Sequence, residues 1–285
     1  MEETICEKEQ GFLLHQPFFN NDEVIDYNEY MQWKPYQALF YEFTTFASNG
    51  PDTMTYIPNG CIDILFIRDA AGNHMEILGS STEVKYIHRL PNARYFGVRL
   101  RPGLYIAYEG MSLKNITNQD FFIEHIDEDL AVFFRDLMDA RSLKECSALF
   151  RSAFDSCLQL AEVNPLTEHV LNVINQSHGT IRIHELADDL HYSERHLSRI
   201  FQDSMGISPK TFARIVRFQT VLNSILRQPV LTLCDYMAEL GYSDQAHFQR
   251  EFKQYTGTTP KRFLSYAQKQ KFPYYDCNGM EQRAC

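Results

Sequence analysis

One short segment of the chain occurs twice, and this repeat limits the fold more than any other feature. The fourteen residues from His196 to Pro209 align without gaps with those from His247 to Pro260, and five positions are identical: His, Arg, Phe, Gly and Pro. A solenoid needs three or more units to bury its core, so a unit that occurs twice is not a solenoid. The repeat instead predicts two similar helical units, which we call the first and the second head.

Each head has the pattern of a helix-turn-helix, in which a short helix and a turn precede a second helix. In the first head the turn is His191–Tyr192, and Ser193 is the predicted N-cap of the second helix. In the second head Gly241 is the predicted turn residue. The inward positions are apolar, at Ile183, Leu186, Ala187, Leu190, Leu197, Ile200 and Phe201 in the first head and at Leu233, Tyr236, Met237, Leu240, Phe248 and Phe252 in the second.

The outward positions of both second helices carry side chains that suit base reading. Arg can pair with guanine through two hydrogen bonds, and Gln can do the same with adenine. A solvated polar face would explain one such helix equally well, but Arg199 and Arg250 stand in register in the two copies, which favours DNA. The outward residues are Glu194, Arg195, Ser198, Arg199 and Gln202 in the first head, and Asp244, Gln245, His247, Gln249, Arg250 and Lys253 in the second.

A longer helix is predicted between the heads. Ser208 is its N-cap, Pro209 its first residue, and it continues to about Arg227. Its length of roughly 27 Å approaches the separation of about 34 Å between successive major grooves on one face of DNA. The helix is apolar on two sides, which predicts burial between two bodies. We interpret Arg214 and Arg217 as packing between the heads rather than as base contacts.

Net charge is unevenly distributed along the chain. The 285 residues carry a formal charge of −10, which by itself argues against a nucleic-acid partner. Residues 166–272, however, hold 13 Lys and Arg against 10 Asp and Glu, and six of the ten histidines. An acidic body with a mildly basic module is typical of a protein that binds DNA through one part.

The rest of the chain predicts an α+β fold, with a β-rich barrel before the helices. Short strands separated by turns run from about residue 12 to 125, and a helical period begins at Asp127. The two helices that follow either cover the barrel or pair with a second copy, and both alternatives stay open. The predicted divisions are a β-rich domain at 1–125, connecting or dimerisation helices at 126–164, the two heads at 165–272 and a tail at 273–285.

The segment Leu166–Gln268 resembles the DNA-binding domain of AraC/XylS-type bacterial transcription regulators. Its most specific stretch is Glu239–Phe263, and Phe212–Gln219 matches the pattern of the family's linker helix. His191 stands where the family usually has Gly, and Met237 where it usually has Ala. The resemblance implies double-stranded DNA and RNA polymerase as partners. It implies base contacts by Arg195, Ser198, Arg199, Gln245, His247 and Arg250, and phosphate contacts by Ser193, Gln202, Ser243, Lys253 and the helix N-termini.

The N-terminal region resembles the cupin-like sensor domains of some AraC-type regulators, through the segments Tyr56–Phe66 and Tyr95–Gly103. Cupin metal sites need clustered histidines, whereas His15, His74, His88 and His125 are scattered, so no metal and no other cofactor is expected. A barrel of this kind suggests a pocket for a small-molecule effector. Its candidate lining is Tyr56, Phe66, Tyr86, Arg94, Tyr95, Phe96 and Arg99, with Arg101 as a further cation.

Three functions compete. The first is a ligand-responsive transcription regulator, and the second is a DNA-binding protein that senses nothing and uses its barrel for dimerisation or polymerase contact. The third is an alkyl-transfer or cupin-type enzyme with Cys61 as nucleophile, but no partner for that thiol is evident, so no catalytic residue is predicted. The seven cysteines are widely spaced without a Cys-x-x-Cys, and no apolar run reaches the roughly 20 residues of a membrane helix, so a cytoplasmic protein is expected.

Overall fold

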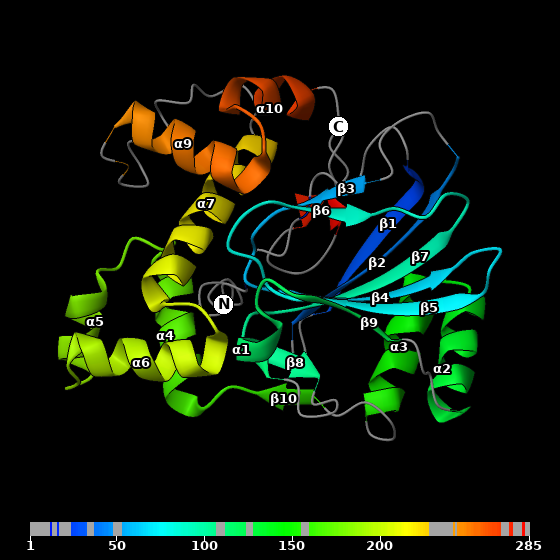
Figure 1. Cartoon of the computed structure of the whole chain (residues 1–285), viewed down its shortest axis with the longest axis horizontal. Helices are drawn as coiled ribbons and strands as arrows, with labels where there is room; N and C mark the ends of the chain where they lie inside the picture. Colours follow the sequence, from blue (N-terminus) through cyan, green and yellow to red (C-terminus); the bar gives the residue numbers. More distant parts are fainter. Residues whose placement is uncertain are drawn as a thin grey trace, which may run out of the picture.

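The computed structural model describes residues 12, 16, 24–32, 37–47, 53–106, 112–123, 128–154, 160–227, 242, 244–268, 274–275 and 281–282. The fold is α+β, as the sequence predicts: a β-rich body carries helices on one face, and a purely helical module lies beside it (Figure 1). We use "body" for the described residues up to 154 and "helical module" for residues 165–268.

Six antiparallel strands form the main sheet of the body, in the order β1-β2-β7-β4-β5-β9. Side chains alternate between its two faces. On β4, Ile62, Ile64 and Phe66 join one apolar cluster, whereas Leu65 and Ile67 join the other. Both faces are therefore buried. The strands are β1 (Val24–Gln32), β2 (Ala38–Thr45), β4 (Ile62–Arg68), β5 (Asn73–Leu78), β7 (Arg94–Leu100) and β9 (Asp120–Ile123).

Two helices, α2 (Glu128–Asp139) and α3 (Leu143–Phe154), cover one face of this sheet. The ring of Phe66 lies 5.3 Å from that of Phe134, and the rings of Phe40 and Phe150 are 5.6 Å apart. The helices thus use their apolar sides on the sheet, which is the first of the two alternatives left open by the sequence. A second copy of the chain would have to pair through other sides of these helices.

The opposite face of the sheet is covered by a small antiparallel pair, β3 (Thr53–Tyr56) and β6 (Lys85–His88). Met54 and Ile87 from this pair share an apolar cluster with Tyr41, Leu65 and Tyr95 from the main sheet. Between β3 and β4 the chain turns at Pro58–Gly60, where Gly60 has a φ of +74°. The short helix α1 (Leu113–Ile116) and strand β8 (Leu104–Ile106) complete the body, and β8 pairs with β10 (Leu160–Glu162), which precedes the helical module.

The helical module begins with α4, whose N-cap is Asn164. Its longest helix, α7, contacts α4 and α6 on one side and α10 on the other. The predicted first helix of the second head, with Leu233, Tyr236, Met237, Leu240 and Gly241, lies outside the described residues. The helices are α4 (Pro165–Gln176), α5 (Ile183–Asp189), α6 (Glu194–Met205), α7 (Pro209–Arg227), α9 (Gln245–Thr256) and α10 (Pro260–Ala267), and the tail forms the pair β11 (Tyr274–Tyr275) and β12 (Glu281–Gln282).

The linker helix α7 also packs against the body. The side-chain amide of Gln219 donates to the carbonyl of Pro58 at 2.6 Å, in a buried hydrogen bond. A Cβ atom on Gly60 would lie 2.7 Å from the ring of Phe212, so the turn and the helix are in close contact. The linker therefore touches the body as well as both heads, which agrees with the prediction of a helix buried on two sides.

Candidate nucleic-acid interface

The first head has the geometry of a helix-turn-helix. His191 takes a left-handed φ of +58° in the turn after α5, and Ser193 Oγ accepts from the backbone N–H of His196 at 3.3 Å. Leu197 and Phe201 are buried. Among the residues predicted to contact DNA, Arg195, Arg199, Gln202 and Ser193 are exposed and Ser198 is half-buried.

An exposed stack orders the central arginine of this head. The rings of Tyr192 and His196 are stacked with centroids 5.4 Å apart, and Arg199 Nη2 lies 3.4 Å from His196 Nδ1. The guanidinium of Arg199 thus lies beside the imidazole of the stack. Tyr192 was predicted only as a turn residue, and His196 was not among the predicted DNA contacts.

The helix α9 of the second head begins at an acidic N-cap. Asp244, not Ser243, is the N-cap of α9, and its Oδ1 accepts from the backbone N–H of His247 at 2.7 Å. A carboxylate at this position repels phosphate. The N-terminus of α6, which is capped by Ser193, is therefore better suited to hold a phosphate than the N-terminus of α9. Ser243 lies outside the described residues. Gln245, Arg250 and Lys253 are exposed and His247 is half-buried, while Phe248 and Phe252 face inward.

A buried carboxylate holds the second head on the linker. Glu251 accepts from Arg214 Nε at 2.8 Å and from the hydroxyl of Tyr242 at 2.9 Å, and its side chain is only 1% exposed. Arg217 lies over the ring of Tyr242, 4.9 Å from its centroid. Burial and the charge of Glu251 raise the pKa of Tyr242. Both arginines of the linker thus pack against the second head.

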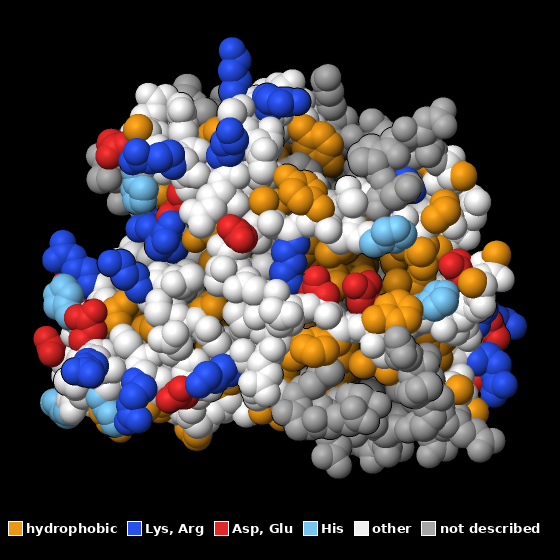
Figure 2. Space-filling view, in the orientation of Figure 1, with side chains coloured by type: hydrophobic (Ala, Val, Ile, Leu, Met, Phe, Trp, Pro, Cys, Tyr) orange, Lys and Arg blue, Asp and Glu red, His pale blue; other side chains and the backbone are white. Residues whose placement is uncertain are grey.

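Basic side chains gather on the helical module. Figure 2 shows Lys and Arg spread over that half of the molecule, from α9 and α10 down to α5 and α6. Arg195, Arg199, Lys210, Arg250, Lys253, Lys261 and Arg262 are all exposed. This distribution matches the charge asymmetry in the sequence, and a phosphate backbone would approach the molecule from this side.

The seven predicted effector residues do not line one pocket, because they lie in three different places. Phe66 and Phe96 face α2 and α3, whereas Tyr56, Tyr95 and Arg99 lie on the opposite face of the sheet. Tyr95 and Phe96 are neighbours on one strand, so alternation alone sends them to opposite faces. Arg94 pairs with Glu42 at 3.1 Å, and Tyr86 is 61% exposed.

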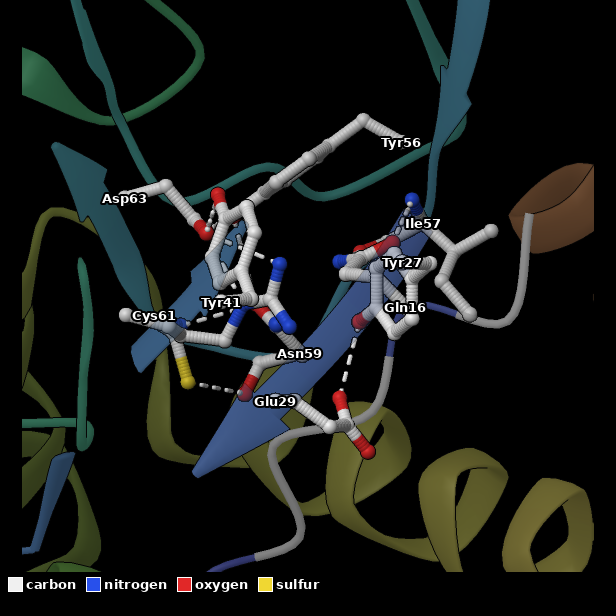
Figure 3. Close-up of polar contacts among 10 residues, drawn as sticks. Gln16, Tyr27, Glu29, Tyr41, Tyr56, Ile57, Asn59, Cys61 and Asp63 are labelled. Carbon is white, nitrogen blue, oxygen red and sulfur yellow. Dashed lines mark hydrogen bonds and ion pairs between the residues drawn. The ribbon is translucent and has the colours of Figure 1, made fainter. Parts of the chain in front are cut away.

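A buried polar cluster lies on the face of the main sheet that β3 and β6 cover (Figure 3). Arg99 contacts Asp63 through two nitrogens, with Nε 3.1 Å from Oδ2 and Nη2 2.8 Å from Oδ1, and both side chains are fully buried. The hydroxyls of Tyr41 and Tyr56 each donate to this carboxylate at 2.7 Å. The carboxylate is thus fully coordinated, and Arg99 is already paired within the body. Arg101, the further cation, binds Glu168 on α4 at 2.9 Å.

Electrostatics make this cluster unreactive. Burial, together with the charge of Asp63, raises the pKa values of Tyr41 and Tyr56. Burial also raises the pKa of the Cys61 thiol. Burial lowers the pKa of Arg99, but the charge of Asp63 outweighs this effect, so the guanidinium stays protonated. A buried thiol with a raised pKa is the opposite of an activated nucleophile, which disfavours alkyl transfer to Cys61.

Several of these residues escaped the sequence analysis. Asp63 interrupts the apolar strand Ile62–Ile67, and a lone carboxylate in such a run is a signal of a buried ion pair. Glu251 replaces the apolar Ile200 of the first head at the equivalent repeat position. No group of three or more possible metal ligands occurs among the described residues, and no described helix is long and apolar enough to span a membrane.

The comparisons with known proteins concern mostly the helical module. A helix-turn-helix domain family matches residues 186–266. The probable transcription factor PqrA of Proteus vulgaris is 32% identical over 101 residues, which cover 35% of this chain and 81% of that protein. The Msm operon regulatory protein of Streptococcus mutans is 26% identical over 164 residues, or 56% of this chain.

The match spans 58% of the length of the Streptococcus mutans protein. Among solved structures, ToxT from Vibrio cholerae covers 81% of this chain and 98% of its own, with 12% sequence identity and a TM-score of 0.44. The C-terminal domain of AraT from Geobacillus stearothermophilus covers 41% of this chain and 94% of its own, with 21% identity and a TM-score of 0.34.

Proposed function

This chain belongs to the AraC-type family of DNA-binding transcription regulators, and we propose that each head reads its own DNA element while the body senses a small molecule. The two elements would lie in adjacent major grooves on one face of the duplex. RNA polymerase and a second copy of the chain are further partners in this proposal.

The proposal that each head reads DNA is supported by the equivalent positions of the exposed arginines in the two copies of the repeat. Arg199 and Arg250 are equivalent and exposed, on reading helices whose inner sides are anchored by Phe201 and Phe252. Both helices pack against the one linker helix, which is the arrangement that two adjacent grooves require. The proposed base contacts are those of Arg195, Ser198, Arg199, Gln245, His247 and Arg250, and the proposed phosphate contacts are those of Ser193, Gln202, Ser243 and Lys253.

The proposal that the body senses a ligand is supported by a short path from its interior to the linker. Tyr56 and Asp63 of the polar cluster flank the turn at Pro58–Gly60, and that turn contacts Phe212 and Gln219 of α7. A ligand that rearranges this cluster would move the turn, and the linker with it. The effect on DNA affinity is a coupling free energy, set by the difference in ligand affinity between the two arrangements.

The base-reading role is tested by two substitutions one helical turn apart. Arg250→Ala should cost about 1–3 kcal/mol at one base position of the second element and relax the preference there. Lys253→Ala should weaken binding to all sequences evenly and lower the salt dependence. Both side chains are exposed, so neither change should affect folding. Sequences selected from a random DNA pool at two salt concentrations give the required data.

Each substitution serves as the control for the other, because both remove one exposed positive charge from α9. Equal losses on specific and random DNA for Arg250→Ala would remove this residue from the base-reading set. If the wild-type chain enriches no pair of elements, the two-headed proposal fails.

The alternative function, DNA binding without ligand sensing, is favoured by one observation. Asp63 and Arg99 already satisfy each other, and Tyr41 and Tyr56 complete the coordination of the carboxylate, so the polar interior is filled by the chain itself. The alternatives are separated by screening small carboxylates and aromatic compounds for a shift in melting temperature and in DNA affinity. A compound that changes both supports sensing, and a complete lack of response supports the alternative.

A further inference from the structure

The body contacts both reading helices at the same point of the repeat. Each helix ends at a glycine in the left-handed conformation, Gly206 after α6 with a φ of +76° and Gly257 after α9 with a φ of +71°. These two glycines are among the five identical positions of the aligned copies. In the folded chain both face residues of the body.

At the end of α6 the contact is made by α1 and the residue after it. The hydroxyl of Thr117 lies 3.1 Å from the carbonyl oxygen of Met205 and 2.8 Å from that of Leu113, so its one hydrogen is shared between these two acceptors. Lys114 Nζ lies 2.8 Å from Asp203 Oδ1. A Cβ atom at Gly206 would lie 2.3 Å from Thr117 Oγ1, which leaves no room for a larger residue. The ammonium group of Lys114 also lowers the pKa of Asp203.

At the end of α9 the contact is made by β6 and the residue before it. The backbone N–H of Val84 donates to the carbonyl of Gln254 at 3.1 Å. A Cβ atom at Gly257 would lie 2.4 Å from the hydroxyl oxygen of Tyr86. The body thus supplies a donor to a carbonyl in the last turn of each reading helix.

These donors answer a general need of helices. The last carbonyls of a helix have no partner within it, and they are satisfied by capping groups, water or other parts of the chain. The proposed base-reading residues lie nearer the other end of each helix, where Arg195, Gln245 and Arg250 remain exposed. Contact with the body therefore leaves the reading ends free.

We propose that the body fixes the separation of the two heads, and thereby the spacing between the two DNA elements that the protein accepts. Thr117 and Tyr86 are then specificity-determining residues, although neither lies in the helical module. The inference rests on the proposed function, in which each head reads its own element. One base pair inserted between the elements rotates the second element by roughly 34–36° around the duplex. Two heads that are each held by the body at the C-terminal end of the reading helix cannot follow that rotation.

The test varies the spacing between two fixed elements. Full-length protein is titrated with duplexes that carry the selected elements at the selected spacing and at spacings changed by one and two base pairs. The measured quantity is the ratio of Kd at a changed spacing to Kd at the selected one. For the wild-type chain we expect this ratio to reach about tenfold or more, comparable to the loss of one or two base contacts.

The variants are Thr117→Val, which keeps the shape but removes the hydroxyl, Tyr86→Ala, and the double variant. We expect binding at the selected spacing to stay within about threefold of wild type, while the spacing ratio of the double variant falls to about threefold or less. Phe122→Ala is the matched control, because Phe122 is an exposed aromatic residue of the same body on β9, where its ring packs on His74. Its spacing ratio should equal that of wild type.

A charge exchange provides a second test that does not depend on buried groups. Lys114→Asp should lower the spacing ratio, and Lys114→Asp combined with Asp203→Lys should restore it. Because the readout is a ratio, a general gain in DNA affinity from the added lysine cancels.

The outcomes separate the two proposals. If wild type selects two elements but its affinity does not depend on their spacing, or if the variants keep the wild-type ratio, the inference is wrong and the two-headed function stands. If wild type selects no pair of elements, the proposed function fails, and the inference fails with it.

Discussion

At the scale of single residues, the body is specified by charges that it buries. Asp63 and Arg99 form a fully buried ion pair, and two tyrosine hydroxyls complete the coordination of the carboxylate. Such a pair is stabilising only because every partner is present, since each charge alone would lose its hydration without compensation. The cluster therefore fixes the positions of β2, β4 and β7 and the end of β3 relative to one another.

Replacing Asp63 by Asn should destabilise the chain by about 3–5 kcal/mol, because it leaves the buried guanidinium of Arg99 without a counter-charge. The measurement is the free energy of unfolding from urea titration. Asp139→Asn is the control, since its ion pair with Arg68 is exposed, and it should cost no more than about 1 kcal/mol. Equal losses for the two variants would contradict the importance of the buried pair.

Glu76 on β5 should make stability depend on pH. Burial and, to a lesser extent, the charge of Asp120 raise its pKa from 4.5 to about 7, and the charge of Lys85 partly opposes this shift. The folded chain thus binds this proton more tightly than the unfolded chain, so the stabilisation is complete below pH 4.5 and is lost as the pH rises to about 7.

Glu76→Gln keeps the neutral form at every pH. At pH 8 it should be more stable than wild type by roughly 2–3 kcal/mol, and the two proteins should converge as the pH approaches 4.5. Urea titrations between these pH values measure the difference, in which the contribution of the histidines cancels. A constant difference across the range would show that Glu76 does not titrate near neutrality.

At the scale of elements, the turn of the first head carries a conformational cost. His191 is held at a φ of +58°, at a position where AraC-type regulators usually have Gly. A left-handed conformation costs a non-glycine residue about 1–2 kcal/mol. Replacement by glycine removes this cost, but the greater conformational entropy of glycine in the unfolded chain offsets part of the gain. The turn is nevertheless retained, because α5 and α6 are packed on both sides of it.

His191→Gly should therefore stabilise the chain by up to about 1 kcal/mol. Gly206→Ala should have the opposite effect, since it places a Cβ atom at a positive φ and against Thr117. The melting temperatures of the two variants should move in opposite directions. A decrease for His191→Gly would indicate that the imidazole makes a stabilising contact larger than the backbone strain.

At the scale of the whole molecule, a buried amide of the linker helix contributes to the contact between the body and the helical module. Gln219 donates to the carbonyl of Pro58 at 2.6 Å, and both residues are buried. Gln219→Leu keeps a similar volume but leaves this carbonyl without its donor, which should cost about 1–3 kcal/mol.

Calorimetry measures this loss, and it also reports whether the body and the helical module still melt together. Asn223→Leu, which changes a half-buried polar residue one turn further along the same helix, is the control for altered helix propensity. If the two variants melt alike, the contact between Gln219 and Pro58 does not contribute measurably to domain coupling.

Much of this architecture follows from local pattern. The repeat, the caps at Ser193 and Ser208, and the two-sided apolar pattern of α7 are set by residues close together in the chain, and the structure has them where the sequence predicts them. The α+β division and the basic character of the heads are likewise evident from order and composition. The short elements α1 and β9 were not predicted, because four residues carry too little periodicity to stand out.

What only the tertiary structure decided are the relations between distant residues. The predicted effector residues were chosen because they are aromatic or cationic. In the structure, the pleat places some of them on one face of the sheet and some on the other, and Tyr86 lies at the surface of the molecule. Asp63 pairs with Arg99, 36 residues away, and Glu251 pairs with Arg214, 37 residues away. The contacts between the body and the ends of the two reading helices join residues that are still further apart in the chain. The sequence by itself determined the elements and the type of binding surface, because propensity, capping and periodicity act locally. The partner of a buried charge and the spacing of the heads depend on how the elements pack, which no local pattern specifies.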